Sequence, residues 1–167
     1  AAAVAANGYV YALGGSPSAG TQVNTTEYAA IGSSGALGAW SSNTAMGSNR
    51  AQHGAVVENG YIYALSGWPA ENTNEYAKLN SNGTLGTWTA TTNNVGGRRY
   101  AGNTVANGYI YAIGGLGSSN TEYASTQRLR VGGSLDLVGL SGANLADGET
   151  GTGGELTAGN TNIVGGL

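Results

Sequence analysis

Three segments of the chain share one pattern of alternating tyrosine and aliphatic positions, YVYALGG, YIYALSG and YIYAIGG. They begin at Tyr9, Tyr61 and Tyr109, each directly after an Asn-Gly pair. Side chains alternate between the two faces of a strand, so the pattern predicts three strands with tyrosines on one face. Asn-Gly between two β-rich runs predicts a two-residue hairpin, because both residues tolerate positive φ.

The pattern returns with a period near 50 residues. The Asn-Gly-Tyr copies start at residues 7, 59 and 107, which are 52 and then 48 residues apart. A Glu-Tyr pair recurs at a similar period, at Glu27, Glu75 and Glu122. A period of this length with several strands per unit is typical of a β-propeller blade, and one blade cannot bury both of its faces alone.

Four strands are predicted in the second repeat, which is the most complete. They span residues 55–57, 61–65, 74–79 and 85–89, with turn-forming sequences between them. The first repeat follows the same order and ends in a predicted strand over 37–41. Four short antiparallel strands per period predict one all-β blade.

These landmarks resemble the kelch repeat over about residues 1–127. The resemblance rests on an Arg before a small-residue strand, an apolar strand that ends in Gly-Gly, then a Tyr and finally a Trp. It implies four-stranded blades in which the Tyr and Trp pack between neighbouring blades. The residues that carry it are Gly14, Gly15, Gly67, Gly114, Gly115, Tyr28, Tyr76, Tyr123, Trp40 and Trp88.

The repeats predict an incomplete ring of about three blades, over 1–49, 50–97 and 98–127. The first repeat lacks the Arg lead-in, and the third has no Leu-Gly-x-Trp strand. Propellers close with four to eight blades. An open arc would leave aromatic faces exposed to water, and each Å² of apolar surface left unburied forgoes about 25 cal/mol of stabilisation. We therefore expect a piece of a longer chain, or an oligomer in which two copies close a six-bladed ring. The first residue is not Met, and the amino end is interpreted as a cleaved or truncated end.

Residues 128–167 form a Gly-rich tail. The sequence from Val131 to Leu135 is echoed by the last five residues, which predicts the start of a β-stalk array. The alternative is a flexible Gly-rich linker. Asp147-Gly148-Glu149 is either a weak calcium site or a solvated stretch, and the lack of the fuller carboxylate spacing of a calcium loop favours solvation.

Composition limits the chemistry. The 167 residues include no Cys and one His, which excludes disulfides, thiolate metal sites and a cysteine nucleophile. A net charge of −3 and the lack of a basic stripe speak against nucleic acid as a partner. No apolar run approaches the roughly 18 residues of a membrane helix. A cysteine-free, lysine-poor, Asn/Ser/Thr-rich chain fits an extracellular or cell-surface protein of bacterial style.

Few residues are candidates for a site, and each has a structural alternative. Arg50 and Arg98 recur at one period; they either build the blade, by pairing with Glu75 or Glu122 or capping carbonyls, or line a channel that binds an anion. Trp68 has no counterpart in the other repeats and either stacks on a sugar or caps a neighbouring blade. His53 is expected to be structural or solvated, because a lone histidine forms neither a metal cluster nor a triad.

The sequence therefore predicts a non-enzymatic extracellular binding or adhesion scaffold that meets a protein or glycan through blade loops, without a cofactor. Among kelch-like enzymes, a copper-radical oxidase would need a Cys–Tyr crosslink and several His ligands, which this chain lacks. The alternative is a structural subunit of an extracellular filament, sheath or fibre, whose partners are further copies of the chain.

Overall fold

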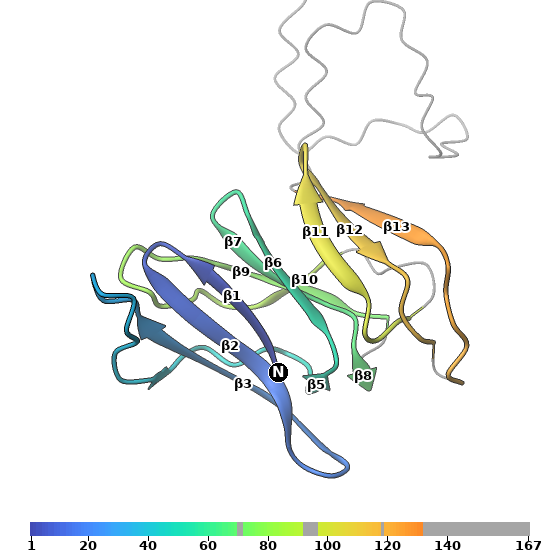
Figure 1. Cartoon of the computed structure of the whole chain (residues 1–167), viewed down its shortest axis with the longest axis horizontal. Coiled ribbons are helices and arrows are strands. Elements are labelled where there is room, and N and C mark those ends of the chain that lie inside the picture. The colour runs from blue at the N-terminus through green and yellow to red at the C-terminus, as the bar shows by residue number, and fades with distance from the viewer. Residues whose placement is uncertain (70–71, 92–96, 118, 132–167) are drawn as a thin grey trace, which may run out of the picture. The chain divides into compact units, whose positions relative to one another are not determined.

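Each Tyr-rich strand is one arm of a hairpin closed by Asn-Gly. The computed structural model describes residues 1–69, 72–91, 97–117 and 119–131. In these residues β1 (Ala2–Ala6) pairs with β2 (Tyr9–Ser18), β6 (Gly54–Glu58) with β7 (Tyr61–Leu65), and β11 (Gly102–Ala106) with β12 (Tyr109–Ile113) (Figure 1). At the three turns φ is 49–52° for Asn and 76–80° for Gly, so the predicted hairpins are confirmed.

Antiparallel pairing extends each hairpin into a sheet. The first sheet has the order β1-β2-β3-β4, with β3 (Thr21–Ala30) and β4 (Ser41–Ser42), and the second has the order β6-β7-β9-β10, with β9 (Asn74–Lys78) and β10 (Thr89–Thr91). The third sheet is β11-β12-β13, with β13 (Thr126–Arg130). A separate pair joins β5 (Arg50–Ala51) to β8 (Trp68–Pro69). The described residues contain no helix, which confirms the all-β class.

The outermost strands begin later than the sequence predicted. β4 and β10 start at Ser41 and Thr89, whereas the predicted strands began at Leu37 and Leu85. Each Leu instead forms a single bridge, Ile31 to Leu37 and Leu79 to Leu85, which closes a tight turn. The chain reaches the sheet edge only after that turn, so the tryptophans precede their strands.

The third sheet ends differently from the prediction. In the first two sheets a tyrosine of the second strand faces a tyrosine of the third, Tyr11 to Tyr28 and Tyr63 to Tyr76. In the third sheet Tyr111 faces Arg128, so Tyr123 is not the equivalent residue. Tyr123 lies in a longer loop before β13.

The reason for this shift is the apolar alternation after residue 127. Leu129 and Val131 are buried in the same cluster as Ile110, on the side of β12–β13 that packs on the second sheet. Glu122 is exposed and cannot supply that face. The third sheet therefore continues past residue 127, where the sequence analysis placed its end, and the compact unit runs from Ala1 to Val131. The rest of the predicted tail lies outside the described residues.

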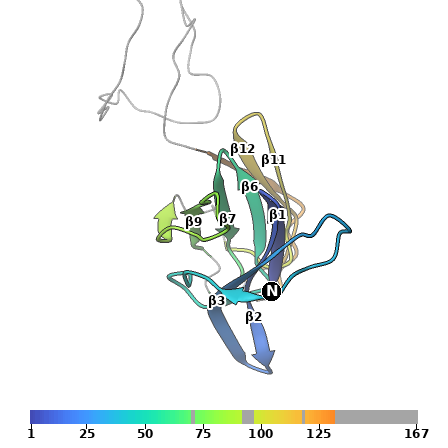
Figure 2. The ribbon, with the colours of Figure 1, turned by 90° about the vertical axis from the view of Figure 1, so that its left-hand side faces the viewer.

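Two apolar clusters join consecutive sheets. In the first, Tyr11 and Leu13 of β2 pack with Ile62, Leu85 and Trp88. In the second, the opposite face of the middle sheet contributes Val56, Tyr63 and Leu65, which pack with Ile110, Leu129 and Val131. The strands β1, β6 and β11 accordingly lie next to one another in chain order (Figures 1 and 2). The Tyr-bearing face of each sheet thus packs on the aliphatic face of the next.

Candidate functional site

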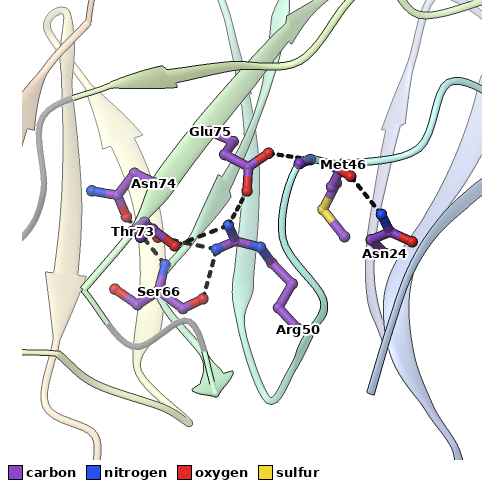
Figure 3. Close-up of polar contacts among 8 residues, drawn as sticks. Asn24, Met46, Arg50, Ser66, Thr73, Asn74 and Glu75 are labelled. Atoms are coloured by element: carbon purple, nitrogen blue, oxygen red, sulfur yellow. Dashed lines mark hydrogen bonds and ion pairs between the residues drawn. The ribbon is translucent and has the colours of Figure 1, made fainter. Parts of the chain in front are cut away.

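Arg50, a predicted binding residue, is enclosed within the second repeat. It is 0% exposed at the start of the two-residue strand β5. Its Nη1 donates to the carbonyl oxygens of Ser66 at 2.8 Å and Thr73 at 3.0 Å, and its Nη2 forms an ion pair with Glu75 (Figure 3). Burial lowers the pKa of Arg50, and the neighbouring Glu75 partly opposes this shift. The guanidinium ties the end of β7 to the start of β9.

Arg98 repeats this arrangement one period later. It is 1% exposed, and its Nη1 donates to the carbonyl oxygens of Gly114 at 2.9 Å and Ser125 at 3.1 Å. The ring of Tyr123 lies 4.9 Å from the guanidinium carbon, where Arg50 has a carboxylate. Both arginines therefore donate through Nη1 to backbone carbonyls within the fold, and both side chains are buried.

The repeated glutamates are not equivalent. Glu75 lies opposite Ala64 and Glu27 opposite Ala12, but the residue opposite Ala112 is Gln127. We expected Glu122 in this position from the repeat, and the register contradicts that. Glu75 also accepts from the backbone N–H of Gly47 at 2.6 Å, which fastens the connection that arrives from the first sheet.

Trp68 occupies an exposed position held by fixed backbone. Its strand β8 pairs with β5, so that Trp68 lies opposite Ala51, and 38% of the residue is exposed. Gly67, before it, has a φ of 91° and donates to the carbonyl of Arg98 at 3.0 Å. A Cβ at Gly67 would lie 2.6 Å from the carbonyl oxygen of Ala51, so only glycine allows this approach.

The side chain of Arg99 packs on Trp68. The guanidinium carbon of Arg99 lies 5.3 Å from the ring of Trp68, a cation–π contact, and its Nη2 donates to Oδ1 of Asn120. Its backbone pairs in both directions with Leu116 at 2.8 and 2.9 Å. Tyr100, the next residue, is 61% exposed. We name Trp68, Arg99 and Asn120 the Trp68 surface.

His53 lies inside the fold and titrates far below neutrality. The residue is 8% exposed, and neither ring nitrogen has a hydrogen-bond partner. Burial, followed by repulsion from Arg50, lowers the pKa of His53 to about 3. The imidazole is thus neutral at physiological pH and inaccessible to a substrate.

Among the described residues, no group of three or more His, Asp or Glu side chains is placed to hold a metal ion. In the same part of the chain, no helix is long and apolar enough to cross a membrane.

Trp68 stands out in the sequence, but its partners Arg99 and Asn120 do not. Arg99 takes the place that Ala51 has in the preceding repeat, directly after the recurring arginine. That departure from an otherwise regular pattern was the available signal. Asn120 lies in a loop whose length differs between repeats, and no sequence signal pointed to it.

The fold defines this chain as an all-β protein of successive antiparallel sheets. No family model and no curated protein matches the chain. Among solved structures it is similar to one described as "Structure of YjhT", with a TM-score of 0.63 and 15% sequence identity. The similarity covers 80% of this chain and 43% of that one, so this chain spans less than half the length of that structure. At this identity the likeness is one of fold alone.

Proposed function

We propose that this chain is a non-enzymatic extracellular binding scaffold, built from kelch-like propeller blades, that recognises glycans through the Trp68 surface. The blade interpretation is supported by the strand order of the first two sheets, by the Tyr and Trp positions that recur between them, and by the Arg that recurs between the second and third repeats. The cysteine-free, weakly charged composition supports an extracellular or cell-surface location.

The observation that carries the proposal is the half-exposed indole of Trp68 on a rigid support. An aromatic ring offers an apolar face with a defined direction, and the C–H face of a sugar ring packs against such a face. Arg99 is stacked on the indole and held by Asn120, so polar groups adjoin the ring and can meet sugar hydroxyls. A recognition surface needs this combination of an apolar platform and a few placed polar groups.

The site offers binding chemistry rather than acid–base chemistry. The one histidine of the chain is buried with a pKa of about 3, and the two recurring arginines are enclosed by backbone carbonyls. General acid–base catalysis needs a group within reach of substrate that titrates near the working pH. His53 meets neither requirement, which favours a binding module over an enzyme.

The proposal is tested by measuring the binding of three proteins, wild type, Trp68→Ala and Trp40→Ala, to a glycan array. Wild type is expected to bind at least one glycan class, and Trp68→Ala to weaken that binding about tenfold or more, because truncating an anchoring aromatic removes most of a small interface's affinity. Trp40→Ala is the matched control, because Trp40 is 46% exposed, comparable with Trp68, and lies in the first repeat; all three proteins are compared at a concentration where the mass is that of one chain. The proposal is wrong if no glycan binds, or if Trp68→Ala binds as wild type does. If no glycan binds but a protein does, and Trp68→Ala loses that protein, the Trp68 surface is a protein-binding surface instead.

A structural subunit of a filament, sheath or fibre is the second candidate. It is favoured by the exposed Ile31, Leu37 and Trp40, which leave an apolar area on the first sheet. Solution mass separates the two functions, because a fibre subunit grows without limit as its concentration rises.

A further inference from the structure

The first and second sheets carry equivalent apolar residues with very different exposure. Leu79, Leu85 and Trp88 of the second repeat are 7%, 4% and 9% exposed. Their equivalents one period earlier, Ile31, Leu37 and Trp40, are 39%, 46% and 46% exposed. The local structure is the same, since Ile31 and Leu79 both donate to the glycine of their hairpin and bridge to the following Leu. The difference therefore lies in what covers them.

The first sheet covers the second with tyrosine rings. A Cβ built at Gly83, in the turn of the second sheet, would lie 2.8 Å from ring carbons of both Tyr9 and Tyr28. At Gly35, the equivalent glycine of the first sheet, nothing lies within 4 Å. Both glycines have nearly the same φ, 86° and 83°, so the two turns have the same conformation. They differ in that tyrosine rings pack against the turn of the second sheet and not against that of the first.

The connection that leaves the first sheet completes the cover. Asn43 accepts from the backbone N–H of Leu85 at 2.8 Å, and its amide donates to the carbonyl of Gly83 at 3.1 Å. Thr44 donates to the carbonyl of Leu85 at 2.8 Å and accepts from the indole N–H of Trp88 at 2.9 Å. The occupant of such a face is thus a Tyr-bearing sheet followed by a polar connection.

The third sheet presents the matching Tyr-bearing face, and among the described residues this face belongs to neither of the clusters that join the sheets. Ile110 and Leu129 pack on the second sheet, so the alternate residues Tyr109, Tyr111 and Ile113 face the other way. Ile113 is 50% exposed, whereas its equivalents are buried: Leu13 at 0% and Leu65 at 2%. The chain therefore carries both halves of its own internal interface, one at each end of the described sheets.

Charge is complementary between these two faces. Arg128 and Arg130 share the face of Tyr111 and Tyr109 on the third sheet, and both are exposed. Glu27 is exposed on the opposite terminal face, that of β2 and β3, because its register partner Ala12 alternates with the inward-facing Tyr11. Opposite charges on two surfaces favour their mutual approach and disfavour the pairing of like faces.

We propose that the face around Ile31, Leu37 and Trp40 binds the Tyr109–Tyr111–Ile113 face of a second copy, and that the reciprocal contact closes a head-to-tail pair. Each contact repeats the packing that joins the sheets within the chain. A head-to-tail interface closes into a ring when its rotation permits. Two copies supply six sheets, within the four to eight of closed propellers.

The experiment is sedimentation velocity on the full chain at micromolar concentration. Wild type is expected to sediment at twice the chain mass of 16.5 kDa. Leu37→Asp alters one face and Ile113→Asp the other, and each alone is expected to weaken pairing at least tenfold. Both side chains are about half exposed in the single chain, so folding is expected to survive, which far-UV circular dichroism checks. Tyr100→Asp, at an exposed aromatic outside both faces, is the matched control and is expected to pair as wild type does.

Mixing the two variants distinguishes this geometry from a symmetric one. An equimolar mixture of Leu37→Asp and Ile113→Asp keeps one intact junction, so it is expected to recover measurable pairing that neither variant has alone. A single-chain mass for wild type at all concentrations, open-ended growth, or no recovery on mixing would each overturn the proposal. Glycan binding through Trp68 is measured separately on Leu37→Asp, so failure of the pairing and failure of the proposed binding function are distinguishable.

Discussion

Trp88 and Trp40 occupy the same place in two successive repeats, and their replacement by alanine should destabilise the chain to very different extents. Trp88 is 9% exposed within the cluster that joins the first two sheets, and its indole N–H donates to the carbonyl of Thr44 at 2.9 Å. Truncating a buried Trp costs about 3–5 kcal/mol of unfolding free energy through lost transfer energy and the cavity left behind. The lost hydrogen bond adds little, because the Thr44 carbonyl keeps the hydroxyl of Thr26 at 2.7 Å.

Trp40→Ala should cost less than about 1 kcal/mol in the single chain, since Trp40 is 46% exposed. Urea unfolding followed by far-UV circular dichroism gives both values, at a concentration where the mass is that of one chain. Trp88→Phe keeps a ring in the cavity and is expected to lose about 1–2 kcal/mol, which provides a reading if Trp88→Ala does not fold. Equal losses for Trp88→Ala and Trp40→Ala would refute the packing that we describe between the first two sheets.

Two further predictions concern the buried ionisable side chains of Arg98 and His53. Arg98→Lys should lower the unfolding free energy by about 2–3 kcal/mol, because one ammonium cannot reproduce both the Nη1 bonds to two carbonyls and the planar guanidinium whose Nη2 reaches Oγ of Ser125 and whose face packs on Tyr123. The exposed Arg130→Lys is its control, expected within about 0.5 kcal/mol of wild type in the same urea titration, and equal losses would contradict the role of Arg98. The pKa of His53 in the folded chain is about 3, below the ordinary 6.5, so the unfolded chain takes up a proton first as the pH falls. The unfolding free energy should therefore drop by about 1.6 kcal/mol between pH 6.5 and 5, and a wild-type curve as flat as that of His53→Gln would show that the imidazole is not buried.

The repeat pattern predicted the hairpins and the faces of the central strands. Asn-Gly pairs and alternating Tyr-x-Tyr positions act locally, and the structure confirms both the turns and the separation of Ile62 and Ala64 from the tyrosines. The end of the third sheet was not predictable by the same means. Glu122-Tyr123 matches the recurring pair in letters, yet β13 begins at Thr126, because the burial of Leu129 and Val131 against the second sheet decides the register.

The Trp68 surface was predictable in part. Trp68 is conspicuous in the sequence because no other repeat has a Trp after its Gly-ended strand. The same reasoning grouped Arg50 and Arg98 with it as binding candidates, whereas the structure encloses both among carbonyls. Which arginine reaches the indole depends on how the loops before β11 and after β12 are joined by the Arg99–Leu116 bridge, a contact that spacing along the chain does not encode.

The all-β class, the three hairpins and the period of the repeat can be read from the residues alone, because turn residues and two-residue alternation are local properties of the backbone. Which of the equivalent residues are buried depends instead on how the sheets pack. Trp40 and Trp88 stand in the same local pattern, and Gly35 and Gly83 in the same turn, but in the described part of the chain a sheet packs over the second of each pair and none over the first. Burial depends on the neighbouring surface, and for the two outer faces of this chain we propose that a second copy provides it.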